Sequence, residues 1–291
     1  MFTQPPCINI KTKSIGTLLG CMCGDVLGAC GVHAVFYDSH SALNLASLIV
    51  EKKGVDPDHV ASRGYENSVA MGIPIGIAYK NAPLHVLHGA VRDACVGTHA
   101  HTHPVVVDAA FVLAAAIGWL LHRPPAVTYV EKRILQDKLL QYLVEIAQTD
   151  GMRYKLQLLG HRHVYIPESV TWWPTYLTSP TWQREFALQL QLSEENLFGM
   201  SCDGVVAAAL CAFLHHGMTE CCTSPQNTFL AACHYGGNRN TIASLACACW
   251  GALHGYEDLP KEWLRDLGKG QMGRFRAIEI GYHLVNVNFG I

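Results

Sequence analysis

The turn at residues 236–241, Gly-Gly-Asn-Arg-Asn-Thr, combines residue types that suit the binding of an anion. Its two glycines free the backbone, and the apolar stretch after it predicts a helix whose N-terminal N–H groups attract negative charge. Arg239 adds a planar cationic donor for phosphate. The alternative is an ordinary glycine turn in which Asn240 caps the helix. The residues of this turn leave both interpretations open.

Three histidines alternate in the segment 98–104, Thr-His-Ala-His-Thr-His-Pro. Alternation puts side chains on one face only where the backbone is extended, which makes metal ligation the weaker interpretation. Pro104 suits the first turn of a helix, and His103 or Thr102 would then be the N-cap. We favour capping together with pocket lining, in which His103 faces a polar ligand. A solvated loop is the remaining alternative.

Asp25 stands out because it lies inside an apolar, glycine-rich stretch. The glycines at positions 16, 20, 24 and 28 recur every four residues, a spacing that gives a helix one bare face. Such a face predicts that a second helix packs closely against this one. An acid in such surroundings needs a partner or water, so Asp25 is a candidate for a specific contact.

The elements that position these residues read as helices, because apolar residues recur at helical spacing and no β-alternation of any length occurs. We predict an all-α fold, with one compact domain over residues 1–291. Residues 62–76 read as a loop rich in Gly and Pro, Gly151 is expected to end a helix, and 151–200 are not assigned. Helices are predicted over 38 or 41 to 53, 84–96, 104–121, 131–148, 203–215, 228–235 and 241–255.

The composition narrows the class of protein. Apolar residues make up 50% of the 291 residues and charged ones 15%, with a net charge of −2, which excludes a disordered chain and argues against a nucleic-acid partner. The stretch 104–121 contains Asp108 and reads as a buried helix, so we expect no membrane partner. The 12 cysteines lie mostly in small apolar stretches, and no secretory signal is visible. We therefore expect a reducing, cytoplasmic location.

Several segments, taken in their order along the chain, resemble the ADP-ribosylglycohydrolase family, which includes the dinitrogenase-reductase-activating glycohydrolases and J1-crystallin-like proteins. The resemblance covers most of the chain except roughly residues 130–195. Its motifs are GDVLG at 24–28, RGYENSVAM at 63–71, THAHTHPVVVDAA at 98–110, GGNRNTIASLACACWGALHG at 236–255 and LPKEW at 259–263.

This resemblance implies an all-α protein that hydrolyses the glycosidic bond between ADP-ribose and an acceptor, with two Mg²⁺ ions bound between helices. The family holds the metals on the aspartate pairs of Thr-Asp-Asp-Thr and Gly-Asp-Thr-Asp-Thr motifs. The matching metal positions in this chain are Asp38, Asn238, Asn240 and Thr241. The candidate ligand-binding residues are Asp25, Asn67, Ser68, Met71, His103, Gly237 and Arg239; Ser68 stands where the family usually has a glycine.

The metal motifs depart from the family pattern. Residues 37–40 read Tyr-Asp-Ser-His and keep only Asp38, while Asn238 and Asn240 replace both aspartates of the second motif, with Arg239 between them. One carboxylate beside an arginine does not offset the repulsion between two divalent ions. We therefore predict no cofactor, or Mg²⁺ bound only weakly. We also hypothesise that the Arg239 guanidinium takes part of the space that the metals leave.

Three functions are compatible with these departures. The favoured one is a metal-poor, catalytically impaired family member that still binds ADP-ribose or a related nucleotide. The second is an active hydrolase of ADP-ribosyl bonds with altered catalytic residues, for which Asp38, His40 and Glu66 are the candidates. The third is a structural, crystallin-like protein that keeps the fold without the site. The sequence sets neither the substrate linkage nor the oligomeric state.

Overall fold

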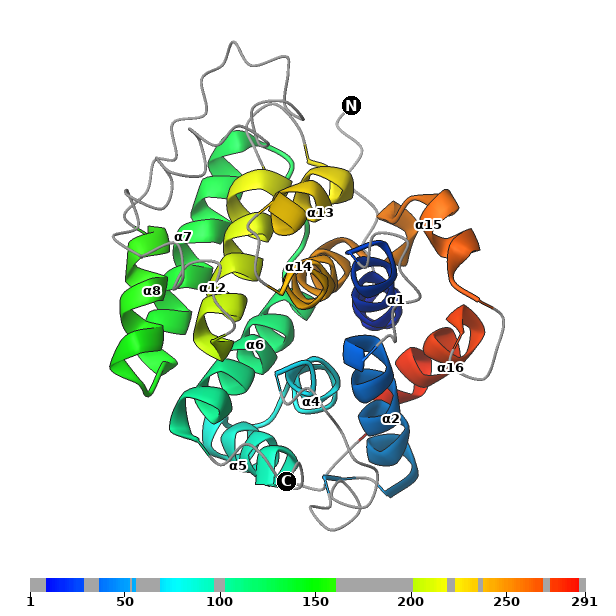
Figure 1. Cartoon of the computed structure of the whole chain (residues 1–291), viewed down its shortest axis with the longest axis horizontal. Coiled ribbons are helices and arrows are strands. Elements are labelled where there is room, and N and C mark those ends of the chain that lie inside the picture. Colours follow the sequence, from blue (N-terminus) through cyan, green and yellow to red (C-terminus); the bar gives the residue numbers. More distant parts are fainter. Residues whose placement is uncertain are drawn as a thin grey trace.

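The computed structural model describes residues 9–28, 37–52, 54–55, 69–96, 103–160, 201–218, 223–234, 238–268 and 273–287 (Figure 1). These residues form helices and connecting turns, with one isolated bridge between Met218 and Thr223. The prediction of an all-α fold is confirmed. The helices are α1 (Ile10–Gly28), α2 (Tyr37–Lys52), α4 (Gly72–Ala78), α5 (Leu84–Val96), α6 (Pro104–Leu121), α7 (Tyr129–Ile146), α8 (Asp150–Gly160), α12 (Cys202–Cys211), α13 (Pro225–His234), α14 (Arg239–His254), α15 (Lys261–Asp266) and α16 (Arg274–Leu284).

The glycine ladder of α1 packs against α14, and the two helices lie side by side although they come from opposite ends of the chain (Figure 1). A Cβ atom at Gly20 would overlap the carbonyl of Cys247, and one at Gly24 would overlap the carbonyl of Ala243. Nearer the end of α1, a Cβ at Gly28 would stand 3.0 Å from the Cα of Asn240. The bare face therefore brings two backbones together, as its spacing predicted.

Glycines at four-residue spacing also form the packing face of α4, so the prediction that residues 62–76 are a loop is wrong from Gly72 onward. Gly72 and Gly76 are four residues apart, and a Cβ at either would overlap the backbone carbonyl of Ala110 or Ala114 on α6. Pro74 falls in the first turn of α4, where its missing N–H costs no helical hydrogen bond. Close packing on α6 thus outweighs the low helix propensity of glycine.

The core centres on α6, which contacts α4, α5, α12 and α14. Among the described residues it is the helix that is long and apolar enough to cross a membrane by length and composition, and 83% of its apolar window is buried inside the protein. The described cysteines are free thiols, and most are buried. The interpretation of these cysteines as packing residues is confirmed for the described part of the chain.

Asp108, in the second turn of α6, explains where α7 ends. Its carboxylate is 1% exposed and accepts hydrogen bonds from the Gln148 N–H at 3.0 Å, the Thr149 N–H at 2.7 Å and the Thr149 hydroxyl at 2.6 Å. This acceptor fixes the turn between α7 and α8. Gly151 lies inside α8, so the prediction that it ends a helix is wrong.

Candidate functional site

Asp25 links the end of α1 to the start of α2. Its side chain is 2% exposed, and one carboxylate oxygen accepts from the Ser39 N–H at 2.9 Å and from the Ser39 hydroxyl at 2.8 Å. Ser39 lies in the first turn of α2, so a negative charge stands at a helix N-terminus, where the helix dipole favours it. The prediction that Asp25 makes a specific contact is confirmed, and that contact is structural.

Two candidate catalytic residues flank this contact. Asp38 and His40 lie on either side of Ser39 in the first turn of α2. The side chain of Asp38 lies outside what the structure describes. His40 is half-buried and makes an interaction of its own. The third candidate, Glu66, lies outside the described residues.

The N-terminus of α14 carries the second degenerate motif. Asn238 occupies the N-cap position with φ −80° and ψ 70°, and its side chain makes no capping hydrogen bond. Arg239 begins the helix and is exposed, Asn240 is half-buried, and Thr241 is 3% exposed. The alternative in which Asn240 caps this helix is wrong, because Asn240 is the second helical residue. The first N–H groups of α14 therefore receive no side-chain cap from Asn238.

The glycine packing of α1 brings these two parts together. A Cβ at Gly28 would lie 3.0 Å from the Cα and 3.4 Å from the amide oxygen of Asn240. Gly28 is the last residue of α1 and stands about one turn beyond Asp25. The end of α1, the start of α2 and the start of α14 therefore meet, although their residues are far apart in the sequence.

The remaining ligand-binding candidates fall into two groups. His103 is exposed and caps α6, because its Nδ1 atom accepts from the Val105 N–H at 3.3 Å. This confirms the predicted cap and leaves the Nε2 side of the ring for other contacts. Met71 is fully buried just before α4 and presents no surface to a ligand in this structure. Asn67, Ser68 and Gly237 lie outside the described residues.

These residues do not fit a pair of divalent cations. Mg²⁺ prefers anionic oxygen ligands in octahedral geometry, and the α14 N-terminus offers two amides and a cation instead. The Asp25 carboxylate already accepts from Ser39. Over the described ranges, no three His, Cys, Asp or Glu side chains are grouped so that they could hold a metal. Arg239 is exposed at the start of α14, and the hypothesis that its guanidinium takes part of the space that the metals leave stays a prediction.

The fold and site define an all-helical protein with a polar site where three helix ends meet. A sequence profile of ADP-ribosylglycohydrolases matches residues 38–280, and the chain therefore belongs to the ADP-ribosylglycohydrolase family. A solved structure described as an "ADP-ribosylglycohydrolase-related protein complex" is similar in fold, with a TM-score of 0.66 and 20% sequence identity. The similarity covers 96% of this chain and 99% of the other. No curated protein is similar enough in sequence to count as a relative.

Proposed function

We propose that this chain is a catalytically impaired family member that binds ADP-ribose, or a related nucleotide diphosphate, without needing Mg²⁺. The observation that carries the proposal is the α14 N-terminus, where two amides stand in place of the metal-binding aspartates and an exposed arginine lies between them. Helix N–H groups and a guanidinium are suited to phosphate. The diphosphate would be held by positive charge from the protein itself.

Electrostatics favours a bound anion over two bound cations. Two Mg²⁺ ions about 4 Å apart repel each other by roughly 17 kcal/mol at an effective dielectric constant of about 20. A site that holds both ions needs several carboxylates to offset this energy. Arg239 adds one more positive charge to the same helix end, which works against the metals and in favour of a diphosphate.

Two further groups are consistent with this assignment. The exposed imidazole of His103 keeps its Nε2 atom available to a ligand, since capping uses only Nδ1. The buried Asp25 carboxylate fixes the start of α2 and, through α1, its position relative to α14. In this proposal His103 and Arg239 contact the ligand, whereas Asp25 positions the helices.

The test is a thermal-shift titration of the full chain with ADP-ribose, in EDTA and in Mg²⁺. A ligand that binds only the native state raises the melting temperature with its concentration. We expect the same shift in both buffers, and at least a tenfold weaker affinity for Arg239→Gln, since a charge-assisted hydrogen bond contributes about 1.5–3 kcal/mol. The matched control is Arg92→Gln, an exposed arginine on α5 whose side chain is 61% exposed.

A restoring variant separates the alternatives. Asn238→Asp, Arg239→Thr and Asn240→Asp together rebuild the family's second motif, and we expect them to make ADP-ribose binding depend on Mg²⁺. No shift with ADP-ribose in the wild type would instead favour the structural, crystallin-like function. Release of ADP-ribose from a modified substrate by the wild type would establish an active hydrolase and overturn the proposal.

A further inference from the structure

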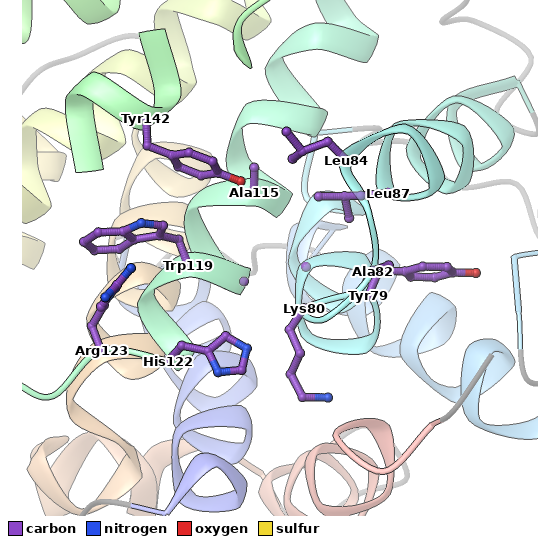
Figure 2. A pocket seen from close by; sticks show the side chains of 12 residues that line it. Tyr79, Lys80, Ala82, Leu84, Leu87, Ala115, Trp119, His122, Arg123 and Tyr142 are labelled. Carbon is purple, nitrogen blue, oxygen red and sulfur yellow. The ribbon is translucent and has the colours of Figure 1, made fainter. Parts of the chain in front are cut away.

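A separate pocket lies at the opposite end of α6 from His103. His103 caps the N-terminus of this 18-residue helix and His122 its C-terminus, so the two ends stand about 27 Å apart. The pocket has a volume of about 200 Å³, and most of its walls come from the C-terminal part of α6 with the residues just after it, from the turn between α4 and α5, and from the start of α5 (Figure 2). Sites for drug-sized ligands are roughly 300–1,000 Å³, so this pocket suits a smaller molecule. Its walls include Lys80, Leu84, Trp119, His122, Arg123 and Tyr142.

Cationic side chains lie near this pocket because their ammonium groups donate to carbonyls at the C-terminal ends of helices. Lys13 is buried in α1 and donates to the carbonyl of Arg123, with the Leu121 carbonyl 3.5 Å away. Lys80 donates to the carbonyl of Val285 at 2.7 Å, just after the end of α16. Cations at helix C-termini are favourable, and this explains how a largely apolar region accommodates the two lysines.

The helix ends do not neutralise this charge. Each C-terminus carries about half a negative charge, so α4, α6 and α16 together supply about one and a half, against the two lining cations Lys80 and Arg123 and the nearby Lys13. None of the described lining residues is an acid. Desolvation lowers the pKa of His122, and a hydrogen bond with the Lys80 backbone raises it. The positive charges of Lys80, Lys13 and Arg123 lower this pKa further. The pocket thus has a surplus of positive charge.

The other walls are flat and apolar. The Arg123 guanidinium lies 4.4 Å from the ring centroid of Trp119, which holds both side chains at the rim. In Figure 2, Tyr142 lies above Trp119, and Leu84 and Leu87 face them across the pocket. The Tyr142 hydroxyl makes no hydrogen bond with the described part of the chain, and burial raises its pKa, so it remains a neutral donor. The apolar wall therefore also carries one polar group for a ligand.

We propose that this pocket binds a small organic anion with a flat apolar body. The carboxylate or phosphate of the ligand would lie toward Lys80, His122 and Arg123, and its ring would lie against Trp119 and Tyr142. The binding is independent of the proposed ADP-ribose site, because α6 separates the two. It combines charge-assisted hydrogen bonds at one end with buried apolar area at the other.

The experiment is a calorimetric titration of the full chain with four probes. Benzoate carries both the charge and the ring, benzamide only the ring, acetate only the charge, and phenyl phosphate exchanges the anionic group. We expect benzoate to bind at least tenfold more tightly than benzamide and than acetate. The comparison of benzoate with phenyl phosphate shows which anionic group the pocket prefers.

Variants connect this binding to the pocket. Arg123→Gln, which changes an exposed side chain, is expected to weaken benzoate binding at least tenfold, and Lys261→Gln on the exposed face of α15 to leave it unchanged. Bound benzoate is also expected to raise the pKa of His122, measured by NMR of its imidazole, because a nearby negative charge favours the protonated ring. Equal affinities for benzoate and benzamide, equal effects of the two variants, or an unchanged pKa of His122 would each overturn the proposal.

Discussion

Replacing Gly20 by alanine tests the packing that places α14 beside α1. The new Cβ atom would overlap the carbonyl oxygen of Cys247 and stand 3.3 Å from the Ala248 nitrogen. Both are backbone atoms in the middle of α14, so the clash cannot be relieved by a side-chain rotation. The two helices would have to move apart along their shared face.

The size of the effect follows from two opposing contributions. Overpacking a close interface costs about 3 kcal/mol where backbone must shift, and alanine in place of glycine in a helix returns about 1 kcal/mol. We expect Gly20→Ala to lower the free energy of unfolding by about 2 kcal/mol. Gly89→Ala in α5 is the matched control, since a Cβ there meets nothing within 4 Å. This control should gain up to about 1 kcal/mol.

Urea-induced unfolding, followed by circular dichroism at 222 nm, measures both variants against the wild type. The expected difference between Gly20→Ala and Gly89→Ala is about 3 kcal/mol. If Gly20→Ala proved as stable as Gly89→Ala, the close approach of α1 and α14 would be refuted. The meeting of Gly28 with Asn240 at the candidate site would then lose its support as well.

Two further predictions concern polar contacts. Ser39→Ala removes one of the two hydrogen bonds that Ser39 donates to the buried Asp25 carboxylate and should cost about 1–3 kcal/mol in urea unfolding; a neutral result would contradict the positioning role of Asp25. Backbone hydrogen bonds from Thr128 and Val127 lower the pKa of Glu131, so its contribution is present at neutral pH and fades as the pH falls below the ordinary value of 4.5. The difference in urea midpoint between the wild type and Glu131→Gln should therefore shrink on acidification, and a constant difference would contradict this.

The sequence predicted best those helices whose first or last residues are typical of helix ends. The helix over 84–96 agrees with α5 at both ends, and Pro104 with His103 marks the start of α6. The four-residue glycine spacing of α1 predicted its close packing, since a helix face without side chains lets the backbone of a second helix approach closely. The predictions of an all-α fold and of the family rest on such features.

Some features depend on contacts between residues far apart in the sequence, and the local sequence pattern therefore did not predict them. α4 is helical because Gly72 and Gly76 pack on α6, and the α7–α8 turn lies where Asp108 accepts its hydrogen bonds. The positive charge beside the pocket includes Lys13, which donates to the Arg123 carbonyl from a position 110 residues earlier in the chain. In the sequence, Lys13 is only a charged residue at the start of an apolar helix. Nothing in that pattern indicates that its partner is the carbonyl of Arg123.

Isothermal titration of the full-length wild type with ADP-ribose, once in EDTA and once with Mg²⁺, tests the central claim most directly. The exposed Arg239 and the start of α14, which receives no side-chain cap from Asn238, predict saturable binding with the same Kd in both buffers. Binding that appears only when Mg²⁺ is present, with the metal itself taken up, would contradict the account.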